Sequence, residues 1–194
     1  MEIKIDISRF IRWNSGMSDS GLEVLYNLSM KVSNLEGCIA EVGVWRGGSS
    51  YLLAAINPNK NIHIFDTFEG LPDQKVETDC SDYQIGDYCE DYRYVSGLLS
   101  GFNNVHIHKG IFPKENSNVI QNEKFSFVHL DCDLYKSMAE SAEFFYPRMV
   151  KGGIMLFDDA PLLKRFFDEF LDTKPEKLMP SGESSLYSAY IEKI

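Results

Sequence analysis

Two apolar stretches that each end on a pair of aspartates constrain this chain more than any other feature. The first is FSFVHLDCD at residues 125–133, and the second is GGIMLFDD at residues 152–159. Apolar runs of this length predict buried strands, and the ligands of a parallel sheet gather beyond the carboxyl ends of its strands. The side chains expected at that edge are those of Asp131, Asp133, Asp158 and Asp159.

Four carboxylates on two neighbouring strands predict a metal site. Like charges held close together repel unless a positive charge lies among them. A hard divalent cation such as Mg²⁺ prefers oxygen ligands and takes one or two carboxylates together with substrate and water. Capping is the ordinary alternative, in which Asp159 caps a helix that begins at Pro161. Capping accounts for one aspartate but not for four.

A glycine-rich turn lies upstream of these strands. EVGVWRGGSS at residues 41–50 predicts a strand, a tight turn and the start of a helix, whose N-terminal N–H groups attract anions. Asp66 ends the next strand about 20 residues later, where a carboxylate can accept hydrogen bonds from ribose hydroxyls. This arrangement serves NAD and S-adenosylmethionine equally, although the dinucleotide fingerprint G-x-G-x-x-G is absent. An ordinary strand–turn–helix connection and a turn-capping Asp66 are the alternatives.

Strands alternate with helices along the chain. This alternation predicts an α/β fold with a parallel sheet, and 194 residues are enough for one domain. A capping box at Ser20 and Glu23 predicts the first helix, within an N-terminal helical segment at residues 1–36. The expected strands are 38–44, 61–65, 105–108, 125–130, 154–157 and a closing strand near 186–192. The expected later helices are 49–56, 87–99, 137–149 and 161–171.

The net charge of −10 is placed unevenly. Residues 66–91 carry nine acidic residues and one basic residue, and we expect either a solvated loop or a lid over the ligand edge. No stripe of lysine and arginine is available for phosphates, so nucleic acid is not an expected partner. No apolar run is long enough to span a membrane and no signal peptide is recognisable, so a cytoplasmic location is expected.

In four segments the chain resembles the macrocin-type sugar O-methyltransferases of antibiotic biosynthesis. These are EVGVWRGGSS at 41–50, FDTFEGLP at 65–72, LDCDLYKS at 130–137 and YPRMVKGGIMLFDD at 146–159. The order and combination of these segments carry the resemblance over roughly residues 38–160. One departure is Ile111, which stands where that family commonly has tryptophan.

The resemblance implies a class I methyltransferase (Rossmann-like) fold with a mostly parallel seven-stranded sheet. It implies S-adenosylmethionine as cofactor, Mg²⁺ held by Asp131, Asp158 and Asp159, and Asp133 as the general base, with Asp131 beside it in the catalytic site. The residues expected to line the cofactor site are Glu41, Gly43, Trp45, Gly47, Ser49, Asp66, Thr67 and Gly110.

The expected reaction is therefore methyl transfer from S-adenosylmethionine to a hydroxyl of a sugar, a glycosylated natural product or a polysaccharide. Transfer is an in-line displacement, so the protein must align two reactants. An NAD-dependent oxidoreductase and a non-catalytic nucleotide- or metal-binding relative are the alternatives. The expected partner is a small-molecule or glycan acceptor, and a homo-oligomer is left open.

Overall fold

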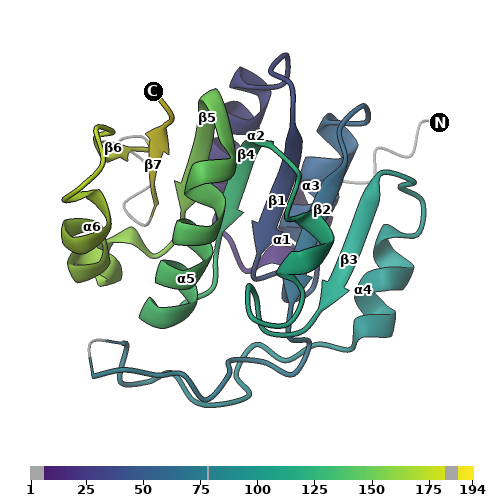
Figure 1. Cartoon of the computed structure of the whole chain (residues 1–194). Coiled ribbons are helices and arrows are strands. Elements are labelled where there is room, and N and C mark those ends of the chain that lie inside the picture. The colour runs from purple at the N-terminus through teal and green to yellow at the C-terminus, as the bar shows by residue number, and fades with distance from the viewer. Residues whose placement is uncertain (1–6, 78, 182–187) are drawn as a thin grey trace.

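Apolar segments in the middle of the chain form the parallel part of a seven-stranded sheet. The computed structural model describes residues 7–77, 79–181 and 188–194. The strand order is β3-β2-β1-β4-β5-β7-β6, with β7 antiparallel to both β5 and β6 (Figure 1). The strands are β1 Cys38–Val42, β2 Ile62–Asp66, β3 Val105–Lys109, β4 Phe125–Leu130, β5 Met149–Phe157, β6 Met179–Pro180 and β7 Ala189–Glu192. The predicted α/β class and mostly parallel sheet are confirmed.

Helices cover both faces of this sheet. Successive strand residues point to opposite faces, so Ile39 packs into one apolar core and Ala40 into the other. The core that contains Ile39 also receives α1–α4, and the core that contains Ala40 receives α5 and α6. The helices are α1 Ile7–Ser15, α2 Asp19–Lys31, α3 Gly48–Ile56, α4 Tyr92–Leu99, α5 Tyr135–Phe145 and α6 Lys164–Leu171, with 3₁₀ turns η1 Ser117–Ile120, η2 Tyr146–Arg148 and η3 Ala160–Leu163.

The order of the strands creates the place where a ligand can enter. From β1 the chain proceeds outward to β2 and β3, then returns to β4 on the other side of β1. Adjacent connections therefore leave in opposite directions at the carboxyl ends of β1 and β4, and open α/β sheets bind ligands at such a switch point.

Several predicted boundaries differ from the structure. The capping box at Ser20 is wrong, because Ser18 is the N-cap and its hydroxyl accepts a hydrogen bond from the Gly21 N–H at 3.1 Å. The helix predicted from residue 87 begins only at Tyr92, where the side chain of Asp91 caps it. In both cases an oxygen-bearing side chain in extended backbone fixes the first turn.

Further differences concern the N-terminal helix, the helix after β4 and the closing strand. The helix α1 has no counterpart of its own in the sequence analysis, and the helix predicted for 137–149 ends at Phe145 before a 3₁₀ turn. The closing strand is confirmed as β7, although residues 186 and 187 of that prediction lie outside the described residues. In the described part of the chain, no helix has the length and apolar character that crossing a membrane requires.

Candidate functional site

A cavity of about 320 Å³ lies at the carboxyl edge of the sheet and reaches the switch point between β1 and β4. Most of the residues singled out in the sequence meet at its wall. Those that line it are Gly43, Trp45, Ser49, Asp66, Thr67, Gly110, Asp131, Asp133, Asp158 and Asp159. Glu41 and Gly47, predicted for the same site, do not line it.

Gly43 allows the first strand and the fourth strand to meet at the cavity. Its φ is +87°, and a Cβ atom there would lie 1.7 Å from the carbonyl oxygen of Asp131. A side chain is therefore sterically excluded at this position. Gly47 has a different role, because a Cβ atom there would lie 3.1 Å from Val95 of α4, away from the cavity.

Asp66 holds the glycine-rich turn against the end of β2. One carboxylate oxygen accepts hydrogen bonds from the N–H groups of Val44 at 2.7 Å and Trp45 at 3.0 Å. The other accepts from the Phe68 N–H at 2.7 Å. The turn-capping alternative is thus realised. The first oxygen has both lone pairs in use, whereas the oxygen that bonds Phe68 keeps a second lone pair for another donor.

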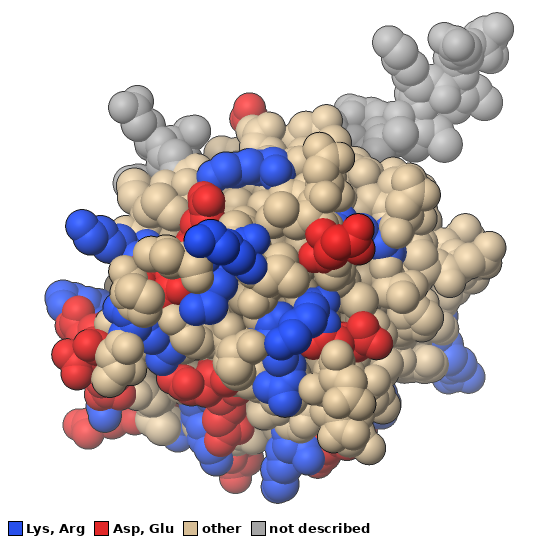
Figure 2. Space-filling view, turned by 45° about the horizontal axis from the view of Figure 1, so that its top comes forward, with Lys and Arg blue, Asp and Glu red and all other residues tan. Residues whose placement is uncertain are grey.

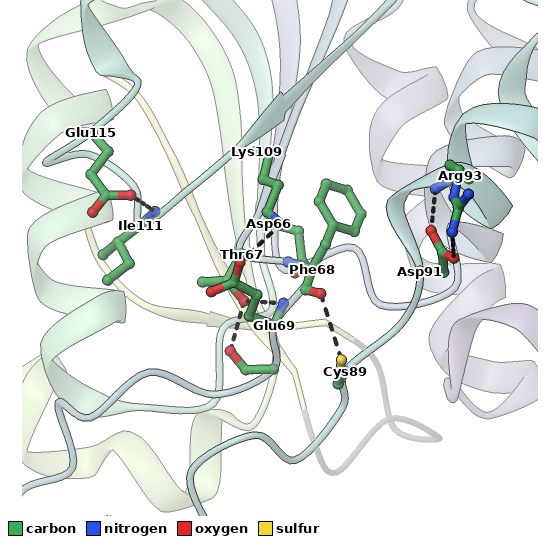
Figure 3. A network of polar contacts seen from close by, with 11 residues as sticks. Asp66, Thr67, Phe68, Glu69, Cys89, Asp91, Arg93, Lys109, Ile111 and Glu115 are labelled. Carbon is green, nitrogen blue, oxygen red and sulfur yellow. Dashed lines mark hydrogen bonds and ion pairs between the residues drawn. The ribbon is translucent and has the colours of Figure 1, made fainter.

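The residues after Asp66 anchor the rest of the acidic segment, residues 66–91. The hydroxyl of Thr67 donates to the carbonyl of Gly70 at 2.7 Å, and Lys109 forms an ion pair with Glu69 at 2.9 Å (Figure 3). From there the segment crosses below the carboxyl edge of the sheet (Figure 1). The two arms of the segment are joined where the Leu71 N–H donates to the carbonyl of Asp87 at 2.8 Å.

Glu41 lies in a fully buried polar cluster within β1. Its carboxylate accepts a hydrogen bond from the Ser50 hydroxyl and is 2.9 Å from Nδ1 of His129. His129 is completely buried, and its Nε2 has no hydrogen-bond partner among the described residues. These contacts tie α3, β1 and β4 together directly behind the cavity.

The four aspartates after β4 and β5 face one another at the cavity. Burial and four neighbouring carboxylates raise the pKa of Asp131 well above its usual range. Burial, followed by repulsion from Asp159, raises the pKa of Asp133 to about 7. Burial also raises the pKa of Asp158 to about 6. The crowded carboxylates therefore resist carrying full negative charge together.

The backbone positions two of these carboxylates in an uncommon conformation. Asp133 has φ 59° and Asp159 has φ 51°, both in the left-handed region. Aspartate tolerates this region better than most residues, and such conformations concentrate at functional sites.

Among the described residues, no group of three or more His, Cys, Asp or Glu side chains is arranged so that it could hold a metal ion.

Tyrosines of the acidic segment complete the cavity, and the sequence analysis did not single them out. The hydroxyl of Tyr83 donates to the carboxylate of Asp159 at 3.2 Å, and the pKa of Tyr83 is raised by burial and by Asp133 and Asp159. Tyr88 packs edge-on against Tyr83 and against Trp45, with ring centroids 6.3 and 6.2 Å apart. The aromatic residues of the acidic segment were the available signal, although no local pattern indicates which of them turn inward.

Comparison with known proteins identifies the family. The family model described as Macrocin-O-methyltransferase (TylF) matches residues 19–177. The chain belongs to the macrocin O-methyltransferase family. This match covers the cavity residues from both the glycine-rich turn and the carboxylate cluster, and it confirms the resemblance seen in the sequence.

Two curated relatives of this macrocin-family chain are O-methyltransferases by name, and the name of the first contains a rhamnosyl group. One, from Streptomyces olivaceus, is the 8-demethyl-8-(2,3-dimethoxy-alpha-L-rhamnosyl)-tetracenomycin-C 4'-O-methyltransferase, 28% identical over 161 residues, which are 72% of this chain and 60% of the relative. The other, from Streptomyces niveus, is demethyldecarbamoylnovobiocin O-methyltransferase, 24% identical over 71% of this chain and 59% of the relative. The chain thus spans about three fifths of the length of these relatives.

Solved structures share the fold of this macrocin-family chain. The O-methyltransferase NovP superposes with a TM-score of 0.78 at 20% identity, covering 93% of this chain and 82% of NovP. The calicheamicin methyltransferase CalS11 superposes with a TM-score of 0.74 at 20% identity, covering 99% of this chain and 93% of CalS11. An apo structure of CalS11, described as a TDP-rhamnose 3'-O-methyltransferase, gives 0.68 at 20% identity over 89% of this chain and 78% of that one. The class I methyltransferase fold is confirmed.

Proposed function

We propose that this chain transfers a methyl group from S-adenosylmethionine to a hydroxyl of a sugar or a glycosylated compound. The observation that carries the proposal is one cavity that joins the glycine-rich turn of β1 to the carboxylates that follow β4 and β5. A methyl donor and a hydroxyl acceptor must meet in line, and a shared cavity provides that alignment. The name of the relative from Streptomyces olivaceus, which contains a rhamnosyl group, supports a glycosylated acceptor.

Different residues of the cavity are assigned to the cofactor and to the acceptor. Gly43, Trp45 and Ser49 line the side expected to receive the cofactor, and Asp66 keeps the turn in place while retaining acceptor capacity for a ribose hydroxyl. On the other side, a carboxylate oxygen of Asp133 accepts the proton of the acceptor hydroxyl as general base. Positioned carboxylates of this kind make the acceptor oxygen a better nucleophile.

We include Mg²⁺ in the proposal because of the chemistry of the carboxylates that would hold it. Asp131, Asp158 and Asp159 offer the hard oxygen ligands that Mg²⁺ prefers. The raised pKa values of Asp131 and Asp158 reflect burial first and then neighbouring carboxylates, whose repulsion a cation would relieve. Their side chains still need to rearrange to form a ligand set. When bound, Mg²⁺ would lower the pKa of an acceptor hydroxyl.

Calorimetric titration tests the cofactor assignment directly. Purified protein is titrated with S-adenosylmethionine and, in a separate run, with NADH. We expect saturable binding of S-adenosylmethionine and no binding of NADH. Formation of S-adenosylhomocysteine in the presence of a glycoside acceptor then tests turnover. Absence of S-adenosylmethionine binding at millimolar concentration would overturn the proposal, and binding without turnover of any glycoside would favour a non-catalytic relative.

A further inference from the structure

A second cavity, the β5–β7 cavity, has a volume of about 500 Å³. Its wall is formed by the start of β5, the end of β7 and residues 175–179. Since β7 runs antiparallel to β5, the end of β7 lies beside the start of β5, at the amino edge of the parallel strands. The β5–β7 cavity is therefore at the edge opposite the aspartate-lined cavity. Its volume is in the range of about 300–1,000 Å³ that is typical of small-molecule sites.

Two lysines of this wall are available to a ligand. Lys151 and Lys177 line the β5–β7 cavity, and both are exposed. Neither side chain forms a hydrogen bond or an ion pair with another residue in the described part of the chain. An anion could therefore bind to both ammonium groups without displacing an existing partner.

The other charged side chains of the wall are already paired. The ammonium of Lys193 lies 2.9 Å from the carboxylate of Glu176, and the carboxylate of Glu192 lies 2.8 Å from the ammonium of Lys31 in α2. Among the described residues, the wall contains three lysines and one acidic side chain. The lysines outnumber the acidic groups even when a terminal carboxylate on Ile194 is counted, so the wall is net positive.

Lysine and arginine side chains also gather on the surface at this edge. Figure 2, in which the top of Figure 1 is turned toward the viewer, shows them over the middle of that face. The acidic segment, with nine acidic residues and one basic residue, crosses below the opposite edge of the sheet (Figure 1). Negative charge is thus concentrated away from the β5–β7 cavity, and the field of the protein repels anions less at the amino edge.

The kind of cation in the wall indicates the kind of anion. Planar carboxylates are matched best by the fork of an arginine guanidinium, and the described part of the wall has no arginine. Lysine ammonium groups act as point charges with rotatable donors, which suits a tetrahedral phosphate. Pro175 and Met179 add apolar surface beside the lysines, against which the carbon atoms of a ligand can pack.

We infer that the β5–β7 cavity binds the phosphate group of a small organic phosphate, with Lys151 and Lys177 as its cationic partners. This second ligand site does not depend on the proposed methyl transfer. Half of its lining residues follow residue 177, where the match to the family model ends. The site therefore depends on a part of the chain that the family model does not match.

Calorimetric titration with inorganic pyrophosphate and with glycerol 3-phosphate tests the inference. EDTA is present throughout, because a cation held by the aspartates at the other edge would itself attract phosphate. We expect submillimolar binding of pyrophosphate at low ionic strength, and weaker binding of glycerol 3-phosphate because it carries less charge. In 1 M sodium chloride, where the screening length falls from about 30 Å to about 3 Å, pyrophosphate should bind at least about 10-fold more weakly.

Exposed lysines provide a matched pair of variants. Lys151→Gln/Lys177→Gln should lower the affinity for pyrophosphate at least about 10-fold, because it removes both unpaired ammonium groups. The control Lys114→Gln/Lys124→Gln changes net charge equally at two exposed lysines that do not line the β5–β7 cavity, and it should bind like the wild type. Urea unfolding should give the same midpoint for both variants, since surface substitutions seldom change stability.

Vesicles of phosphatidylcholine that contain phosphatidic acid identify the source of the phosphate. Vesicle binding that requires Lys151 and Lys177, without binding of either soluble phosphate, would overturn the assignment to a small molecule and place the phosphate in a lipid headgroup. Unchanged pyrophosphate binding in Lys151→Gln/Lys177→Gln would overturn the inference. An equal loss in the control variant would also overturn it, because net charge alone would then account for the effect.

Discussion

At the switch point between β1 and β4, the backbone conformation of single residues sets the shape of the cavity. Gly43 has no side chain because the carbonyl of Asp131 occupies the space, and this contact brings the cofactor turn next to the carboxylates. Asp133, shortly after β4, and Asp159, shortly after β5, adopt left-handed backbone conformations. The geometry of the cavity therefore depends on a few backbone positions that tolerate little substitution.

The metal assignment predicts a specific loss in Asp158→Asn. Replacing one anionic ligand should reduce Mg²⁺-dependent methyl transfer by at least about 10- to 100-fold, the loss that even outer-shell partners of metals produce. Binding of S-adenosylmethionine, measured by calorimetry, should change little because Gly43, Trp45 and Ser49 come from the turn after β1 and from α3. The exposed Asp172→Asn is the matched control. Full activity of EDTA-treated wild type would show that the metal assignment is wrong.

Two glycine-to-alanine changes should have opposite effects on stability. Gly43→Ala should lower the free energy of unfolding by more than about 3 kcal/mol, because its Cβ would lie 1.7 Å from the Asp131 carbonyl and its φ is +87°. Gly97→Ala, in the exposed part of α4 with nothing within 4 Å of the added Cβ, should raise it by about 0.5–1 kcal/mol. Urea unfolding measures both, and equal changes would contradict the role given to Gly43.

At the scale of elements, the acidic segment connects β2 to α4 by crossing below the sheet. Its outer part contacts the opposite half of the molecule, since the Tyr135 N–H at the start of α5 donates to Asp79 at 2.7 Å. Tyr83 reaches Asp159 after β5 in the same way. The segment therefore forms part of the cavity wall, and its role as a lid stays a prediction.

Limited proteolysis tests whether the acidic segment closes over ligands. Trypsin sites at Lys75 and Arg93 should be cleaved more slowly when S-adenosylhomocysteine is saturating, because contacts across the cavity would lower the population of open segment. Cleavage after the exposed Lys151, at the opposite edge, is the internal control. Unchanged cleavage between Lys75 and Arg93 at saturating ligand would contradict the lid role. The segment would then be a solvated loop that only contributes to the cavity wall.

At the scale of the whole molecule, histidines and carboxylates give stability opposite dependences on pH. Burial in β2, with His106 and His108 beside it, lowers the pKa of His63 to about 4. His63 thus contributes stability that is present above its unfolded pKa and is lost as pH falls toward 4. Asp133 and Asp158, with raised pKa values, contribute stability that is present at low pH and is lost as pH rises to about 6–7.

The variant His63→Gln isolates the histidine contribution. In the absence of divalent cations, the unfolding free energy of the wild type should fall relative to that of the variant by about 2–3 kcal/mol between pH 6.5 and pH 4. Denaturant unfolding at several pH values measures the difference, in which the carboxylate contributions cancel. Parallel pH profiles for the two proteins would contradict the assignment to His63.

The sequence by itself determined the parts of this protein that depend on neighbours along the chain. The strand at 125–130 and the aspartates that follow β4 and β5 were predicted from short apolar runs and the polar residues beside them. The family followed from four such segments in order. Local patterns carry this information because strand burial and turn chemistry act over a few residues.

Only the tertiary structure decided which distant residues meet. Glu41 belongs to a predicted cofactor segment, yet packing places it behind the cavity on His129, 88 residues away. Tyr83 lies in a segment with no strong periodicity and reaches Asp159, 76 residues away. Strand order and the path of the acidic segment set these contacts, and both depend on how apolar faces pack across the whole sheet, which no short stretch of sequence specifies.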